Sequence, residues 1–159
     1  MIVIDNTVLS NFALVQRPEV IQDAFCEPVC TTEHVFNELT RGIELGRLPT
    51  CSWEWLERIH MTEPELRQYT ELRRQLDEGE ASCLAVATQR KWKVATDDKD
   101  ARKWAIRLHI PHTGTLGILG LLITQNHMAL TEGNAWLHRM IEAGYHSPMK
   151  TLDGLIQGE

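Results

Sequence analysis

The sequence predicts an α/β fold in three layers, with a short central parallel sheet and helices on both of its faces. Short apolar runs such as Ile2-Val3-Ile4 are rich in β-branched residues and too brief for helices, which favours buried strands. Longer segments between them carry apolar residues three and four positions apart, which favours helices. This alternation is typical of a parallel sheet, because each crossover between parallel strands needs a helix or a long connection.

The N-terminal part is expected to contain a strand at 2–4, a helix at 6–15, a second helix from Pro18, a strand at 27–31, and a helix that follows the Thr31-Thr32 pair and reaches Ile43. Proline suits the first turn of a helix, because the N–H group that it lacks would be unpaired there. A threonine can cap a helix by accepting from a free backbone N–H group. The first half of the chain is therefore predicted as two strand–helix units.

The remainder is expected to contain a loop at 42–49, an edge strand at 58–61, a helix at 64–76, a helix from Gly79-Glu80 to Ala87, a strand at 93–96, a helix at 101–108, a strand at 110–113, and helices to the end. Gly42, Gly46 and Pro49 predict the loop, since glycine and proline interrupt regular structure. The pattern adds three more short strands to the sheet.

Length and composition indicate one globular domain over residues 1–159. Hydrophobic residues make up 43% of the chain and charged residues 24%, which is ordinary for a domain with its own core. The formal net charge of −6 argues against a general nucleic-acid coat protein, which would normally be basic. It does not exclude an enzyme whose acids hold metal ions, because a bound cation reverses the local charge.

The N-terminal residues, the lengths of the apolar stretches and the cysteines favour a cytoplasmic protein that does not bind a membrane. The first five residues have no basic region, and the most apolar stretch, 116–123, is far shorter than the ~20 residues of a membrane span. The four cysteines show no CxxC pair, so free thiols in a reducing compartment are the preferred interpretation.

Acidic residues stand at predicted strand ends and helix starts. Asp5 ends the first strand, and the stretch ATDDKDARKWA (95–105) crowds three aspartates after a later one. In a parallel sheet, such positions open into a common crevice. A carboxylate can simply stabilise a helix N-terminus, as at Glu80. Acids that converge, however, need a cation, and oxygen ligands without histidine or cysteine suit Mg²⁺ or Mn²⁺.

The order IDNT…VFNEL…EGEASCLAVA…ATDDKDAR…HTGTLGIL resembles the PIN-domain nuclease family, in the branch of VapC-like toxin ribonucleases that reads GEA…DDxxAR…TGTLG. The resemblance spans residues 2 to about 156. It implies a PIN-like fold, acids that bind Mg²⁺ or Mn²⁺, cleavage of single-stranded RNA, and the toxin half of a toxin–antitoxin pair.

Matched residue by residue, the resemblance implies that the catalytic and metal-binding acids are Asp5, Glu38, Glu80 and Asp98, with Asp97 as a further metal ligand. Much of the family reads TxDxDF at the fourth acid. Here Thr96, Asp98 and Asp100 fit, but Ala101 replaces the aromatic residue. Which aspartate ligates the metal is therefore open, and the preferred order is Asp98, then Asp97, then Asp100.

Four further residues are expected to contact the substrate: Thr7, Lys99, Arg102 and Thr115. A basic rim beside an acidic site would attract a phosphate backbone. Thr7 fits a small polar position of the family, although a helix-start residue that bonds its own backbone would look the same. Thr115 opens a predicted helix, whose free N–H groups could approach a phosphate.

The combined interpretation is a Mg²⁺- or Mn²⁺-dependent endoribonuclease that hydrolyses phosphodiester bonds of single-stranded RNA. Cleavage of DNA is not separated from cleavage of RNA by the sequence. The alternative is a catalytically silent module of the same fold that binds a protein partner or nucleic acid. A homodimer is also expected, because 116–123 and the segment around Leu137, Met140 and Ile141 are strongly apolar, and a cognate antitoxin is a further expected partner.

Overall fold

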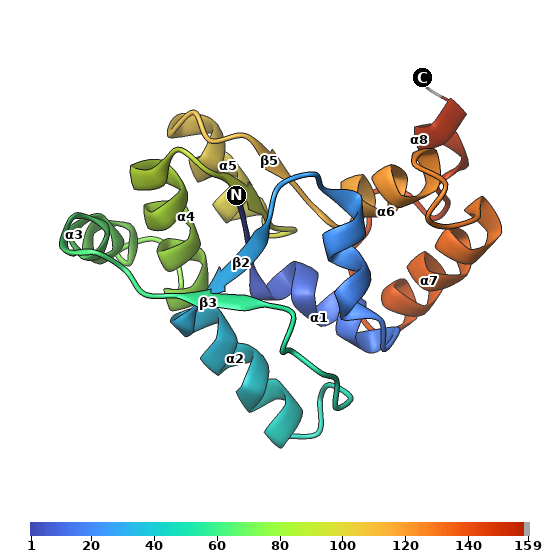
Figure 1. The fold of residues 1–159 in the computed structure, drawn as a ribbon, viewed down its shortest axis with the longest axis horizontal. Coiled ribbons are helices and arrows are strands. Elements are labelled where there is room, and N and C mark those ends of the chain that lie inside the picture. Colours follow the sequence, from blue (N-terminus) through green and yellow to red (C-terminus); the bar gives the residue numbers. More distant parts are fainter. Residues whose placement is uncertain (158–159) are drawn as a thin grey trace.

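Five parallel strands form the centre of the computed structural model, which describes residues 1–157 (Figure 1). The strands are β1 (Ile2–Ile4), β2 (Val29–Thr32), β3 (Glu57–Ile59), β4 (Lys93–Ala95) and β5 (His112–Thr113). Their order in the sheet is β3-β2-β1-β4-β5, with Ile2 opposite Val29 and Ile4 opposite Ala95. The predicted parallel sheet is confirmed, and β1 lies at its centre.

Helices cover both faces of this sheet. They are α1 (Asn6–Leu14), the 3₁₀ helix η1 (Pro18–Ala24), α2 (Glu33–Glu44), α3 (Glu63–Leu72), α4 (Glu78–Arg90), α5 (Lys99–Arg107), α6 (Thr115–Thr124), α7 (Leu130–Glu142) and α8 (Asp153–Gln157). In Figure 1, α3, α4 and α5 lie on one side of the sheet, and α1, α6 and α7 lie on the other. Contacts of α4 with β1, β2 and β4 place it directly on the first face.

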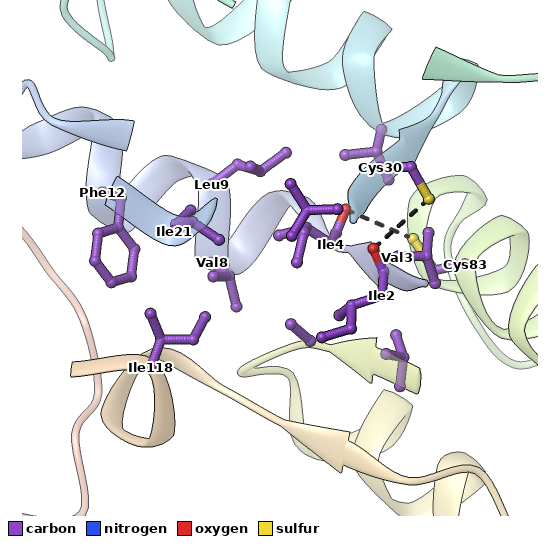
Figure 2. Packing of buried hydrophobic residues seen from close by; sticks show 14 of the residues in the cluster. Ile2, Val3, Ile4, Val8, Leu9, Phe12, Ile21, Cys30, Cys83 and Ile118 are labelled. Atoms are coloured by element: carbon purple, nitrogen blue, oxygen red, sulfur yellow. Dashed lines mark hydrogen bonds between the residues drawn. The ribbon is translucent and has the colours of Figure 1, made fainter. Parts of the chain in front are cut away.

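The core is built around β1, whose three residues are fully buried. Figure 2 shows Val8, Leu9 and Ile21 packed beside this strand. From β2 and α4, the thiols of Cys30 and Cys83 point at the backbone carbonyls of Ile2 and Ile4, at 3.6 and 4.0 Å (Figure 2). A strand with both faces covered must be apolar throughout, which explains the unbroken Ile-Val-Ile run.

Several element boundaries differ from the predicted ones, for local reasons. The second strand begins at Val29 and not at residue 27, because Pro28 has no N–H group to give to the sheet. The segment after Pro18 is a 3₁₀ helix. Helix α3 ends at Leu72; Leu76 keeps the helical spacing and is buried, but it lies in a turn because Asp77 already caps α4.

The most apolar part of the sequence forms α6, which is apolar because much of it packs into the core. Ile118, Leu119 and Leu122 are buried in the core, as are Leu137 and Met140 of α7. Part of the apolar surface that suggested a homodimer is thus covered within the chain, whereas Leu121, Ile123 and Ile141 are only partly buried, and the homodimer stays a prediction. Within residues 1–157, no helix combines the length and the apolar character needed to cross a membrane.

The strand order predicts a crevice at the carboxyl ends of the central strands. From β1 the chain moves outward to β2 and β3, and then returns across β1 to β4 and β5. The boundary between β1 and β4 is therefore the point where the winding direction changes. In open parallel sheets, ligands bind outside the carboxyl ends of the strands at such a point. Asp5 follows β1 here, and the aspartates 97 and 98 follow β4.

Candidate active site

Asp5 is buried at the carboxyl end of β1, beside the boundary with β4. Its backbone N–H donates to Ala95 O at 2.8 Å, so the pairing of β1 with β4 extends to this residue. Only 2% of Asp5 is exposed. One carboxylate oxygen, Oδ2, accepts from the hydroxyl of Thr96 at 2.8 Å and from the hydroxyl of Thr7 at 3.3 Å. The two threonines therefore fix the direction of the Asp5 side chain.

Burial makes the anionic form of Asp5 costly. Loss of hydration raises the pKa of this carboxyl from 3.8 to about 7. Hydrogen bonds from Thr96 and from the backbone of Asn6 act in the opposite direction, and the nearby charges of Asp77 and Glu38 add to the rise. Asp5 is thus an acid whose ionised state would be favoured by a cation, and no side chain of residues 1–157 forms a salt bridge with it.

Glu38, on α2, lies close to Asp5, and the glycine of α4 at position 79 lies beside both carboxylates. A Cβ atom placed on Gly79 would lie 2.9 Å from Glu38 Oε2 and 3.6 Å from Asp5 Oδ1. Both carboxylates therefore approach one point on the α4 backbone, which has room for them because residue 79 has no side chain. Desolvation and the charge of Asp77 raise the pKa of Glu38, while a hydrogen bond with Asn6 lowers it.

Glu80 belongs to a capping box at the start of α4. Its N–H donates to Asp77 Oδ1 at 2.8 Å, and its carboxylate accepts from the Asp77 N–H at 3.3 Å. Burial raises the pKa of Glu80 to about 8, and the charges of Asp77, Asp98 and Asp5 contribute. Glu80 is therefore both a helix-capping residue, as its position suggested, and a member of the acidic group.

Asp77 is an acid of this group that the sequence analysis did not select. Its charge raises the pKa of Asp5, Glu38 and Glu80 alike. The available signal was its position three residues before Glu80, where a capping box is expected. That spacing predicts a cap but does not show that the cap faces Asp5, which depends on how α4 lies on the sheet.

The aspartates after β4 point to different partners. Asp98 caps α5, since its Oδ1 accepts from the Ala101 N–H at 2.8 Å. Asp97 Oδ1 accepts from the Thr115 N–H at 2.9 Å, at the start of α6. Asp100 is exposed in the first turn of α5. Only Asp98 of these three is among the charges that raise the pKa of Glu80.

Of the four residues expected to contact the substrate, two line one pocket and the other two lie outside it. Lys99 and Thr7 line a pocket of about 680 Å³ that also includes Asp98, Arg47 and Tyr145. Arg102 is half-buried, and its charge acts on Tyr145. The other threonine, at position 115, is fully buried, and its hydroxyl donates to a carboxylate oxygen.

A second pocket, of about 550 Å³, is lined by Glu38, Asp77 and Gly79. His34 and Arg41 also line it. Both pockets are within the size range of small-ligand sites. Each of the two pockets is thus lined by acids of this region and by at least one basic side chain.

The donor set matches hard divalent cations. Among residues 1–157, no acid of the group forms a salt bridge, so the carboxylates face one another without a paired cation. Carboxylate oxygens in this number suit Mg²⁺ or Mn²⁺. In the part of the chain that the structure describes, however, no three such side chains are already placed to hold one ion. Glu38 is exposed and Glu80 half-buried, so both have room to turn.

Comparison with known proteins gives one match. A family model described as a PIN domain covers residues 1–158. This chain belongs to the PIN-domain family. Searches of curated proteins and of solved structures each returned no match. PIN domains are generally nucleases that use divalent metal ions, so the family agrees with the acidic crevice; the VapC-like toxin branch and its motifs stay a prediction.

Proposed function

We propose that this PIN domain is a Mg²⁺- or Mn²⁺-dependent endoribonuclease that hydrolyses single-stranded RNA. The observation that supports it most strongly is a group of neighbouring acids near the switch point of the sheet, none of which forms a salt bridge within residues 1–157: Asp5, Glu38, Glu80 and Asp98. Burial and mutual repulsion raise the pKa of three of these acids, and such perturbed groups in a crevice are typical of functional sites.

In this proposal Asp5, Glu38, Glu80 and Asp98 hold the ion, with Asp77 adjoining them. When bound, the metal supplies an activated water and neutralises charge on the phosphodiester. The protein's own contribution is to fix Asp5 through the hydroxyls of Thr7 and Thr96, and to let Glu38 approach across Gly79. Binding would draw Glu38 and Glu80 toward Asp5.

The pocket beside Asp98 is the proposed path of the RNA strand. Lys99 and Arg47 line it and can contact phosphates, and Tyr145 offers an aromatic ring to an unpaired base. This local basic character would outweigh the net charge of −6 where the strand lies. A toxin role, a cognate antitoxin and a cytoplasmic location belong to the same proposal, and they rest on the resemblance to VapC-like proteins. The four free cysteines fit a reducing compartment.

The deciding experiment changes Asp5 to Asn, which keeps the side-chain size and removes one negative charge. We expect cleavage of a mixed pool of single-stranded RNA with Mn²⁺ to fall by about 100-fold or more. The melting temperature of the metal-free protein should hold or rise, because repulsion and desolvation at Asp5 are relieved. Asp23→Asn, an exposed position in η1, is the matched control and should leave both quantities unchanged.

The same preparation separates the alternatives. A chelator should abolish cleavage by the unaltered protein, and a parallel pool of single-stranded DNA tests the preference for RNA. No cleavage of either pool with Mn²⁺ would favour the silent binding module. A lowered melting temperature with unchanged cleavage in Asp5→Asn would instead make Asp5 a structural acid and contradict the proposed site.

A further inference from the structure

Asp97 is held by hydrogen bonds on both of its carboxylate oxygens. Oδ1 accepts from the Thr115 N–H at 2.9 Å. Oδ2 accepts from the Thr115 hydroxyl and from the Asn11 side-chain amide, the latter at 3.1 Å. The amide of Asn11, which is itself buried, also donates to Thr115 Oγ1 at 3.1 Å. Asp97, Asn11 and Thr115 thus form a closed network that joins β4, α1 and α6.

This network supplies what the start of α6 lacks. The N-cap residue of α6 is Gly114, which has no side chain to accept from the free N–H groups of the first turn. Asp97 accepts from one of them, and its negative charge is favourable at the positive end of the helix dipole. A Cβ on Gly114 would lie 2.5 Å from Asp97 Oδ1, so glycine is needed there to admit the carboxylate.

Asp98 is placed differently, although it is the next residue. Its Oδ1 caps its own helix, α5, by accepting from Ala101. It also lies close enough to Glu80 for its charge to act on that acid. On the other side, burial raises the pKa of Tyr145 and the charge of Asp97 adds to this rise, so the Asp97 carboxylate lies near Tyr145. Asp98 therefore belongs to the acidic group, whereas Asp97 faces α6.

We infer that Asp97 is a positioning residue and not a metal ligand: it caps α6 from the end of β4 and so fixes the strand end that carries Asp98. The backbone supports this, because the Asp97 N–H donates to Thr7 Oγ1 at 2.9 Å and the Asp98 N–H donates to Thr96 Oγ1 at 3.2 Å. Those two hydroxyls also donate to Asp5. The inference rests on the proposed function, since it decides which acids of that site bind the ion.

The test is the same substitution at two neighbouring positions, Asp97→Asn and Asp98→Asn, in the full chain. Mn²⁺ affinity is measured by titration, and the melting temperature is measured without metal. Asn caps a helix about as well as Asp, so Asp98→Asn should keep its melting temperature and lose Mn²⁺ affinity by about tenfold or more. Asp97→Asn should do the reverse: Mn²⁺ affinity within about threefold of the unaltered protein, and a melting temperature lower by ~3 °C or more.

The physical reason lies in the partners of Asp97. An amide at position 97 would turn its NH₂ group toward the Asn11 amide or the Thr115 N–H, and both of these are donors. Thr115→Val, which removes one donor, should also lower the melting temperature, and its effect should be less than additive with that of Asp97→Asn. Thr115→Ser keeps the hydroxyl and should restore most of the stability lost in Thr115→Val.

RNA cleavage gives a readout that simple destabilisation would not move. For Asp97→Asn we expect a reduced kcat, with the Mn²⁺ concentration for half-maximal rate unchanged. For Asp98→Asn that Mn²⁺ concentration should rise by about tenfold or more. Equal losses of Mn²⁺ affinity in the two Asn variants would overturn the inference, and so would an unchanged melting temperature or full additivity with Thr115→Val.

Failure of the proposed function would look different. If the unaltered protein takes up no Mn²⁺, the metal-dependent nuclease is rejected. The melting temperatures alone then test whether Asp97 stabilises the start of α6. A loss of stability in Asp97→Asn that is non-additive with Thr115→Val supports it, and the absence of either contradicts it.

Discussion

Gly79 shows how a single missing side chain can shape the acidic crevice. A Cβ at this position would crowd Glu38 Oε2 at 2.9 Å and would come within 3.6 Å of Asp5 Oδ1. The residue lies in the first turn of α4, where alanine would otherwise be preferred to glycine by up to ~1 kcal/mol. Helix propensity therefore favours alanine at position 79, whereas the space occupied by the two carboxylates favours glycine.

Gly79→Ala separates these two effects. We expect the melting temperature to hold or rise slightly, because the backbone is restricted in the unfolded chain. Mn²⁺ affinity should fall by about threefold to tenfold, because the methyl group displaces the Glu38 carboxylate from its approach to Asp5. Gly154→Ala is the matched control, since a Cβ at that position meets nothing within 4 Å. Equal Mn²⁺ affinities of the two variants would show that Glu38 does not act at this point.

Helix starts are the elements that present most of the acids. Asp77 and Glu80 form the capping box of α4, and Asp98 caps α5. Carboxylates are stabilised at such positions by free N–H groups and by the helix dipole. The fold can therefore gather several negative charges in one crevice, because part of the repulsion between them is offset by helix geometry.

The element-scale prediction compares two substitutions of Glu80. Glu80→Gln keeps an oxygen that can accept from the Asp77 N–H, so the capping box should persist. Glu80→Ala removes that bond and should lower stability by about 0.5–1 kcal/mol more, as measured by urea unfolding without metal. Both variants should lose Mn²⁺ affinity to a similar degree, because the charge is absent from both. Normal Mn²⁺ affinity in Glu80→Gln would restrict Glu80 to its capping role.

For the molecule as a whole, the crowded acids connect stability to pH. The pKa values of Asp5 and Glu80, raised mainly by burial, are about 7 and about 8 in the fold, against ordinary values of 3.8 and 4.5. The fold therefore favours their protonated forms. Their stabilising contribution is complete below about pH 4 and is lost as the pH rises through about 7 to 8.

We expect the melting temperature of the metal-free protein to fall between about pH 5 and pH 8, by ~5 °C or more from these groups. Asp5→Asn should flatten part of this slope, and saturating Mn²⁺ should oppose it, because the ion competes with protons for the same oxygens. Glu71→Gln, at an exposed position of α3, serves as the control. A melting temperature that rises steadily over this range in the metal-free protein would contradict the crowded site.

The sequence by itself determined the alternation of strands and helices and the place of each selected acid within it. Hydrophobic spacing differs between strands and helices, so β1, α2 and α4 could be predicted close to their observed bounds. Asp5 after a strand and Glu80 at a helix start follow from those local patterns. The resemblance to PIN domains added the fold family, which the family match confirms.

Only the tertiary structure decided which of these positions meet. The order β3-β2-β1-β4-β5 brings the end of β1 beside the end of β4, and the placement of α4 on the sheet adds Asp77 to the acids. Asp97 and Asp98 are neighbours in sequence, yet Asp97 bonds to Thr115, eighteen positions further along. Ile118, Leu119 and Leu122 of α6 and Leu137 and Met140 of α7 are buried in the core of this chain. These outcomes depend on contacts between distant residues, and such contacts leave no mark on the local spacing of side chains from which a sequence is interpreted.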